Sequence, residues 1–347
     1  MAAELYRGIL GREPDPDGLA DKARQLRAGL PLHRLIRGFL ESDEYRSQIG
    51  GQVPPSAELP NLIEELPDRY AMPEVRGGAM PVYLARGDDD IVLMEQMIEQ
   101  HLYYDKTGVW SPLIDLDKHV TAAIVRGLGA RSCFELGCFT GPVLSLLAGA
   151  GIDVLGSEVS HSAFTFAYPN ARRAMRYGDL LTLAIDRRFD VVLCMDVLEH
   201  VSPLRLDSYM ARLAALIEDD GYLYLNAPMW GRDRVYGEVE DQYIDEWRQV
   251  GDAAWWRHWP CDNRGWPVHG HLVWASPIWW EENFARHGLV RDITIERAIH
   301  QTLAGFFAGA PGRRSLFVLR RPDNRRPSVE IAAAVSAGLA PLTAAAR

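Results

Sequence analysis

The residues best placed to do chemistry in this chain of 347 residues lie in the stretch S-C-F-E-L-G-C-F-T-G, Ser132–Gly141. An apolar run leads into Glu135, and then Gly137 and Gly141 precede a second apolar run. This pattern predicts a strand, a tight turn and a helix. Glycines in such a turn permit positive φ and let a ligand approach the backbone closely. A later apolar run ends in Glu158, and a carboxylate at that strand end is placed to accept hydrogen bonds from ribose hydroxyls.

The spacing of the glycines separates two classes of ligand. A dinucleotide needs G-x-G-x-x-G, because its pyrophosphate sits on backbone N–H groups at the start of a helix. Here the order is Glu135-x-Gly137-x-x-x-Gly141, with Cys138 and Phe139 where glycine would be needed. S-adenosylmethionine carries a sulfonium and an ammonium group and no phosphate. An acidic residue beside the turn therefore suits S-adenosylmethionine better than NAD.

At these residues the sequence resembles the class I S-adenosylmethionine-dependent methyltransferases. The resemblance spans about residues 121–320 and rests on E-L-G-C-F-T-G, Glu158, Gly178-Asp179-Leu180, and F-D-V-V-L-C-M-D-V-L-E-H-V from Phe189 to Val201. It implies a Rossmann-like α/β fold with a doubly wound, mostly parallel seven-stranded sheet. It also implies an enzyme that uses S-adenosylmethionine. A non-catalytic binding protein of this fold and an NAD-dependent oxidoreductase are the alternatives from other classes.

The resemblance also implies roles for single residues. The two glycines would shape the turn under the cofactor, Glu135 would hold the turn and the ammonium group, and Glu158 would bind the ribose diol. Asp179 would accept from the adenine amino group, although a helix cap or a turn is the plain alternative for this residue. The expected cofactor-binding residues are Glu135, Gly137, Gly141, Glu158, Asp179, Leu180 and Asp196.

Asp196, Glu199 and His200 have the spacing i, i+3, i+4, which puts them on one side of a helical turn. Two carboxylates and an imidazole are metal-ligand types. The pattern resembles the E-x-x-E-H site of small-RNA 2′-O-methyltransferases, with Asp196 in place of the first glutamate. However, D-V-L-E-H-V is also common in methyltransferases that need no metal. We therefore expect no metal, and an active-site wall in which His200 is a possible base.

The acceptor segment is expected at about residues 227–277, where a lid usually lies in this fold. Eight of the ten tryptophans fall in or just after it, at Trp247, Trp255, Trp256, Trp259, Trp266, Trp274, Trp279 and Trp280. Aromatic rings suit the C–H faces of sugars or an aromatic acceptor, although some of these rings are expected to be core. Interleaved arginines offer binding of a phosphate or carboxylate on the acceptor, namely Arg232, Arg234, Arg257 and Arg264.

His271 is the first candidate for the general base and His200 the second, because histidine has a pKa near working pH. The segment H-G-H-L-V-W from His269 resembles a late segment of methyltransferases that act on sugars and small molecules. The expected acceptor is a sugar hydroxyl in a glycan or glycolipid precursor, which would make the reaction a polysaccharide modification. A small-molecule O- or N-methyltransferase of secondary metabolism is the alternative.

Alternating helical and strand patterns must position these residues, and they predict a parallel sheet with helices on both faces. The expected strands are Cys133–Leu136, Val154–Ser157, Val191–Met195 and Tyr222–Leu225, with closing strands at Leu289–Ile295 and Ser315–Leu319. The expected helices are Ile91–His101, Asp117–Val125, Pro142–Ala150, Ser160–Met175, Arg205–Ile217 and Ile278–His287.

Outside this domain the chain divides into three further parts. Residues 1–48 include L-Y-R-G-I-L-G-R-E-P-D-P-D-G-L and resemble a small helical domain of unknown function, which suggests a protein partner or self-association. Residues 49–88 contain six prolines and predict an extended linker. The methyltransferase domain is expected at 89–321, and residues 322–347 form a Pro- and Ala-rich tail that is expected to be peripheral.

Composition argues against several classes of protein. The net charge of −10 disfavours nucleic acid as a partner. No apolar run approaches the ~20 residues that span a membrane, and the N-terminus lacks the layout of a signal peptide. The four cysteines show neither metal spacing nor a disulfide framework, which favours reduced thiols and a cytoplasmic protein.

Overall fold

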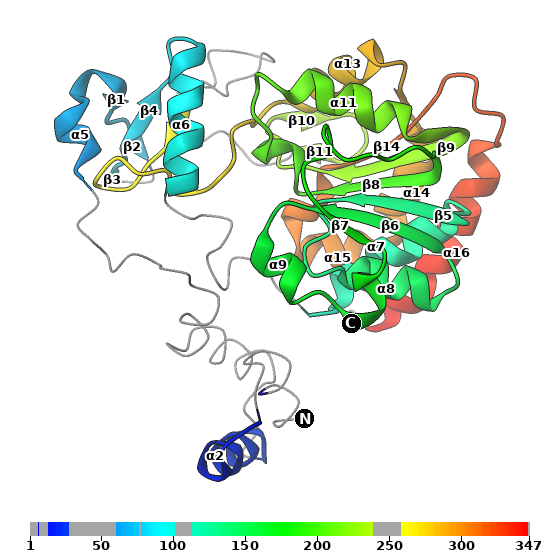
Figure 1. The fold of residues 1–347 in the computed structure, drawn as a ribbon. Coiled ribbons are helices and arrows are strands. Elements are labelled where there is room, and N and C mark those ends of the chain that lie inside the picture. The colour runs from blue at the N-terminus through cyan, green and yellow to red at the C-terminus, as the bar shows by residue number, and fades with distance from the viewer. Residues whose placement is uncertain are drawn as a thin grey trace.

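The computed structural model describes residue 6 and residues 13–27, 60–75, 78–100, 113–238 and 258–345. Its centre is a seven-stranded sheet in the order β13-β14-β9-β8-β5-β6-β7 (Figure 1). Strands β5 to β9 pair in parallel, whereas β14 and β13 close one edge in antiparallel fashion. This confirms the doubly wound, mostly parallel α/β sheet. The strands are β5 (Ser132–Leu136), β6 (Asp153–Glu158), β7 (Met175–Tyr177), β8 (Phe189–Met195), β9 (Ile217–Asn226), β13 (Val290–Arg291) and β14 (Leu316–Arg320).

The sheet separates two apolar cores because successive side chains of a strand point to opposite faces. In β8, Val192 packs into the core under α11 (Leu206–Ala215) and α13 (Pro277–Arg286). Its neighbour Val191 packs into the core under α7 (Leu116–Gly127) and α8 (Pro142–Gly149). Figure 1 shows α11 and α13 over one face and α7 and α8 over the other. All four of these helices were expected from the sequence.

The helix expected at Ser160–Met175 is broken into shorter pieces. α9 (His161–Thr165) ends before Pro169, which opens α10 (Pro169–Arg172), and β7 starts at Met175. Proline has no N–H to continue a helix and is favoured in the first turn. The sequence pattern therefore predicted helix in the right region, but it missed the break before Pro169 and the strand that begins at Met175.

The closing strand expected at Leu289–Ile295 is shorter than expected, because its last three residues belong to a helix. Only β13 is extended, and α14 (Ile293–Thr302) follows directly. The side chain of Asp292 accepts the N–H of Ile295 at 3.2 Å and so caps the new helix. Asp is a favoured N-cap because it satisfies an otherwise unpaired donor, and this cap outweighs the strand preference of the isoleucines.

The tail is part of the core rather than peripheral. Residues 328–345 form α16 (Ser328–Ala345), which packs on α7 and α14. Val335 and Leu339 are fully buried. A Cβ placed on Gly127 of α7 would come within 2.5 Å of the Val335 backbone, so the two helices touch closely there. The absence of a side chain at Gly127 permits this close contact.

Residues expected to form an extended linker contain regular structure instead. Within 60–75 and 78–88 lie α5 (Leu62–Glu65), η1 (Pro67–Arg69), β1 (Tyr70–Ala71), β2 (Glu74–Val75), β3 (Gly78–Ala79) and β4 (Val82–Leu84), and α6 (Asp88–Gln100) follows. β4 pairs with β1 on one side and with β12 (His258–Pro260) on the other. β12 belongs to the tryptophan-rich insertion. The pairing could not be read locally because it joins segments far apart in the sequence.

We call residues 60–75, 78–100 and 258–272 the accessory lobe. Its own core includes Tyr83, Met94, Trp259 and Trp266, all buried. The Trp266 indole donates to the Pro60 carbonyl at 3.1 Å. A segment rich in proline can therefore be ordered through its carbonyl groups, which proline retains.

The helical N-terminal unit is described only in part. Its described helix is α2 (Pro16–Arg27), in agreement with the expected helical unit. Apart from residues 6 and 13–15, the rest of the unit lies outside the described ranges. No helix in the described part of the chain is long and apolar enough to cross a lipid bilayer.

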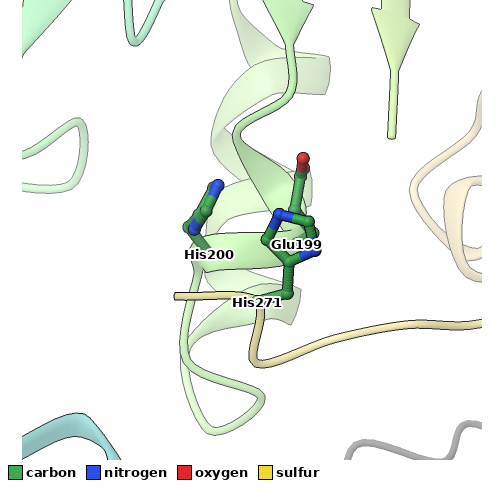
Figure 2. Close-up of side chains that lie close together, drawn as sticks. All are labelled: Glu199, His200 and His271. Atoms are coloured by element: carbon green, nitrogen blue, oxygen red, sulfur yellow. The ribbon is translucent and has the colours of Figure 1, made fainter. Parts of the chain in front are cut away.

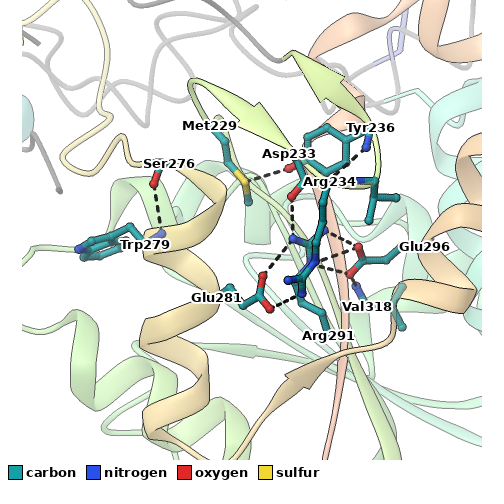
Figure 3. Close-up of polar contacts among 11 residues, drawn as sticks. Met229, Asp233, Arg234, Tyr236, Ser276, Trp279, Glu281, Arg291, Glu296 and Val318 are labelled. Carbon is teal, nitrogen blue, oxygen red and sulfur yellow. Dashed lines mark hydrogen bonds and ion pairs between the residues drawn. The ribbon is translucent and has the colours of Figure 1, made fainter. Parts of the chain in front are cut away.

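A buried ion network fastens the insertion to the far edge of the sheet (Figure 3). Arg291 of β13 donates to Asp233 of β10 (Arg232–Asp233) at 2.7 Å and to Glu296 of α14 at 2.5 Å, and it also pairs with Glu281 of α13. The Arg291 side chain is 1% exposed. Burial raises the pKa of Glu296 to about 7 against the opposing effect of Arg291. The Arg291 guanidinium therefore supplies the positive charge that compensates the two buried carboxylates, Asp233 and Glu296.

Replacement of Arg291 should destabilise the fold far more than loss of an exposed ion pair. Arg291→Leu leaves Asp233 and Glu296 buried without a counter-charge, so the free energy of unfolding should fall by about 3–5 kcal/mol. Arg188→Leu, which removes two exposed ion pairs, should lower the free energy of unfolding far less, because water screens such pairs. Urea titration followed by tryptophan fluorescence compares the two variants. Equal losses would contradict this account of the network.

Candidate active site

A cavity of about 710 Å³ lies at the carboxyl ends of β5, β6, β7 and β8. The chain runs outward from β5 to β7 and then returns to β8 on the other side of β5, so the cavity is at the topological switch point where ligands of such sheets bind. The sequence-predicted residues that line it are Glu135, Gly137, Glu158, Asp179, Leu180, Asp196 and His200. Gly141 and His271 lie beside it. The accessory lobe adds residues that the sequence did not indicate, namely Glu95, Ile98, Glu99 and Leu272.

The turn between β5 and α8 has the left-handed backbone that its glycines predict. Gly137 has φ 66°, and a Cβ there would come within 2.5 Å of the Val197 side chain. Gly141 has φ 75° and is the N-cap of α8. Phe139 also has positive φ, at 50°, although it is not glycine. A residue with a Cβ pays roughly 1–2 kcal/mol there, so something must hold the turn in place.

Glu158 holds it. One carboxylate oxygen accepts the N–H of Phe139 at 2.8 Å, and the other accepts those of Val159 and Ser160 at 2.8 and 2.7 Å. Burial raises the pKa of Glu158, while these hydrogen bonds oppose the rise. A carboxylate has about four acceptor positions. Three are filled by the backbone, which leaves one on the oxygen that faces Phe139.

Glu135 is a buried carboxyl group, and one of its oxygens lacks a hydrogen-bond partner among the described residues. The residue is 5% exposed, and this oxygen is its Oε2. Burial raises its pKa to about 8, the nearby Glu158 adds to the rise, and Lys118 opposes it. An unpaired carboxylate oxygen on the wall of a cavity fits a cationic ligand such as an ammonium group.

Asp179 is held firmly at the far side of the same edge. Its Oδ2 accepts from Arg205 at 2.8 Å and from the Tyr209 hydroxyl at 2.5 Å, and its Oδ1 accepts the N–H of Leu181 at 2.8 Å. Burial acts to raise its pKa, but these hydrogen bonds together hold the pKa below the usual value. Asp179 thus forms a local turn and still faces the cavity, so the two interpretations of this residue are compatible.

Asp196 has a partner that the sequence did not indicate. It has φ 53°, and its carboxylate forms an ion pair with Arg313 of η4 (Pro311–Arg314). Arg313 also pairs with Asp117 at 3.2 Å. Burial raises the pKa of Asp196, and the Arg313 guanidinium opposes that rise. The arginine is more than a hundred residues away in the sequence and belongs to no motif.

Glu199 and His200 form a cluster with His271 instead of with Asp196. Figure 2 shows the three side chains close together. Glu199 and His200 lie on η3 (Leu198–His200), and His271 lies on the segment between β12 and α13. The His200 and His271 ring centroids are 4.7 Å apart. Because Asp196 lies before η3 in a left-handed conformation and pairs with Arg313, the predicted helical face does not form. Burial lowers the pKa of His200 to about 4 and that of His271 to about 3, so both imidazoles are neutral.

Most of the described tryptophans are core residues. Trp259, Trp266, Trp274 and Trp280 are at most 8% exposed. None of the tryptophans in the described ranges lines the cavity. Trp247, Trp255 and Trp256, and also Arg257, lie outside these ranges. Arg234 pairs with Glu281, and neither Arg232 nor Arg264 lines the cavity.

Comparison with known proteins identifies two regions. A family model described as a methyltransferase domain matches residues 116–289, half of the chain. A second model, described as a domain of unknown function (DUF4214), matches residues 2–49.

Individual relatives are distant. The chain is 24% identical over 174 residues to the ubiquinone biosynthesis O-methyltransferase of Rhodopseudomonas palustris strain BisA53, which covers 44% of this chain and 68% of that protein. It is 29% identical over 136 residues to the protein of the same name from Burkholderia multivorans, covering 36% and 57%.

Among solved structures, 1,6-didemethyltoxoflavin-N1-methyltransferase of Burkholderia thailandensis has a TM-score of 0.42 at 14% identity, covering 72% of this chain and 97% of that one. CalS10, an amino pentose methyltransferase from Micromonospora echinaspora, has a TM-score of 0.41 at 16% identity, covering 65% and 96%. The family match over half of the chain shows that the protein belongs to the class I S-adenosylmethionine-dependent methyltransferases, with a DUF4214 region at its N-terminus.

Proposed function

We propose that this methyltransferase transfers the methyl group to a hydroxyl oxygen of a small organic acceptor. The observation that carries the proposal is the neutral imidazole of His200 on the wall of the same cavity that the cofactor residues line. A hydroxyl becomes acidic as the methyl group arrives and needs a partner for its proton. The relatives named as O-methyltransferases of ubiquinone biosynthesis support an oxygen acceptor.

We assign the cofactor to the carboxyl ends of β5, β6 and β7. Glu135 binds the ammonium group through its unpaired oxygen, and Glu158 uses its remaining acceptor position for the ribose diol. Gly137 and Gly141 shape the turn, Asp179 and Leu180 receive the adenine, and Asp196 forms the wall next to the methionine end. When bound, S-adenosylmethionine supplies an electrophilic methyl group. The protein's task is then mainly to position the acceptor in line with it.

We propose the reverse order for the two candidate bases. His200 lines the cavity, whereas His271 packs against the His200 ring. His200 Nδ1 lies 3.0 Å from the Gly270 carbonyl. Because a carbonyl only accepts, Nδ1 carries the proton and Nε2 is left with its lone pair. We therefore place the acceptor hydroxyl at His200 Nε2, with His271 as the residue that supports it.

A sugar hydroxyl of a glycan or glycolipid precursor is the narrower version of this proposal. Its main support was the tryptophan-rich insertion, and the described tryptophans of that insertion are mostly core. A free small-molecule hydroxyl therefore has the better support. For residues 1–48 we propose a role in contact with a protein partner or a second copy.

Binding of the cofactor should become tighter as the pH rises from about 6 to 8. The free enzyme holds a proton on Glu135, whose pKa is about 8, and the ammonium group requires the carboxylate form. Below that pKa binding must expel the proton, so affinity should fall by up to about tenfold per pH unit. Titration calorimetry with S-adenosylhomocysteine, which carries the same ammonium group, measures the affinity and the protons released.

Glu135→Gln is the matched variant. It should bind more weakly at pH 8 and lose the rise that the wild type shows. Any titration of the ligand's own ammonium group is common to both proteins and cancels in the comparison. Parallel pH profiles for the two proteins would refute the assignment of Glu135 to the ammonium group.

Truncation of His200 should affect the reaction and not the cofactor. His200→Ala should lower kcat by about 10²–10⁴-fold, the usual contribution of a group that handles the acceptor proton, while cofactor affinity stays near the wild-type value. His300→Ala is the control, because His300 is also a buried neutral imidazole but contacts Tyr236 and Phe307 away from the cavity. Steady-state assays against a panel of hydroxyl and amine acceptors measure kcat. An equal loss in both variants, or turnover of amines alone, would rule out the proposal.

A further inference from the structure

Glu199 is a buried carboxyl group that the proposed cofactor residues do not explain. Its side chain is fully buried, and neither carboxylate oxygen has a hydrogen-bond partner among the described residues. A buried polar group without a partner is costly, and an ionised carboxylate is the most costly of all. The fold keeps this group beside the reaction cavity, so it should serve a ligand.

The neighbours of Glu199 are those of a metal site. One carboxylate oxygen and one nitrogen each of His200 and His271 all lie within 4.8 Å of one another (Figure 2). Two histidines and a glutamate are the protein ligands of many catalytic zinc sites. An ion with bonds of about 2.1 Å holds tetrahedral ligands about 3.4 Å apart, so small side-chain rotations bring the three together.

The surroundings hold these ligands in position. The Gly270 carbonyl accepts from His200 Nδ1 at 3.0 Å, which turns the lone pair of Nε2 away from that carbonyl. A metal-binding histidine commonly donates its other N–H to a carbonyl in this way. The backbone N–H groups of Leu272 and Val273 donate to the Glu199 carbonyl at 2.6 and 2.9 Å. These bonds fix the segment that carries His271 against η3.

We propose that Glu199, His200 and His271 bind one divalent transition-metal ion at the wall of the active-site cavity. Two imidazoles favour zinc, manganese or iron(II) over magnesium, which prefers oxygen ligands. Three protein ligands leave at least one coordination position open. His200 lines the cavity, so the open position is accessible to the acceptor. The site differs from the D-x-x-E-H set that the sequence spacing suggested, because Asp196 pairs with Arg313 and His271 replaces it.

The role of the ion rests on the proposed methylation of a hydroxyl. The acceptor oxygen binds at the open position and gives up its proton to solvent as the ion lowers its pKa. The oxygen then attacks the methyl carbon, the C–O bond forms, and the C–S bond breaks with its electron pair on sulfur. The products are the methyl ether, neutral S-adenosylhomocysteine and one released proton. In this arrangement Nε2 of His200 binds the ion, so the ion and the solvent take over the acceptor proton from the free imidazole proposed above. The acceptor oxygen stays at the same wall of the cavity.

Metal binding can be tested without any acceptor. Zn²⁺ and Mn²⁺ are titrated separately into the full-length protein after removal of any affinity tag and dialysis against a chelator. We expect one ion per chain. Glu199→Gln and His271→Ala should each weaken binding by more than about tenfold. Asp196→Asn should keep an affinity near the wild-type value, because Asp196 is not a ligand in this cluster.

Two further measurements keep the test decisive. His269→Ala removes an adjacent imidazole outside the cluster and should retain the ion. Thermal unfolding with and without metal shows that each variant is folded.

Chelated enzyme should lose methyl transfer and regain it with the ion that binds. Absence of binding, binding unchanged in Glu199→Gln and His271→Ala, or full activity in chelator would overturn the proposal. Because binding is measured without acceptor, its failure leaves the proposed methyl transfer standing, and failure of that reaction does not alter the binding result.

Discussion

The carbonyl oxygen of Glu199 joins the two parts of the active site. It accepts the N–H groups of Leu272 and Val273, and so fixes the end of the accessory lobe against the carboxyl edge of the sheet. The cavity then has one wall from the strand ends and another from α6 and Leu272. His271 reaches His200 only because its chain neighbours are held there. A side chain more than seventy residues away is thereby placed as accurately as one on the same turn.

The acidic side chains in and beside the cavity suit a cationic ligand. Glu135 and Glu158 line the cavity, Glu199 is buried next to the lining residue His200, and burial raises the pKa of each of the three carboxyl groups. Backbone N–H groups compensate Glu158, whereas Glu135 and Glu199 retain oxygens without partners in the described part of the chain. Such a surplus of acceptors is costly in the empty site and is reduced when a cation binds. In the proposed assignments, the ammonium group of the cofactor would compensate Glu135 and a metal ion would compensate Glu199. The fold tolerates the surplus because its cores and the Arg291 network provide stability elsewhere.

The sequence predicted the parts of the fold that depend on local pattern. The strand, turn and helix around Gly137 and the strand that ends at Met195 were correct, because each element shows its own periodicity and its own turn residues. Apart from the local breaks at Pro169 and Asp292, the prediction failed where a distant contact decides the structure. The residues around Tyr83 become strands because β12 pairs with them, and α16 is buried because α7 offers a glycine at the contact.

The same distinction explains which site residues the sequence could indicate. The proposed cofactor residues lie at the ends of consecutive βα units, so their spacing along the chain reflects their spacing in space. Arg313 and the lobe residues Glu95 and Leu272 line the cavity from other parts of the chain, and no fixed spacing along the sequence indicates them. The lobe side of the cavity consists of such residues. A family that varies its insertions can therefore keep one cofactor and change its acceptor, and local motifs will identify the first much more readily than the second.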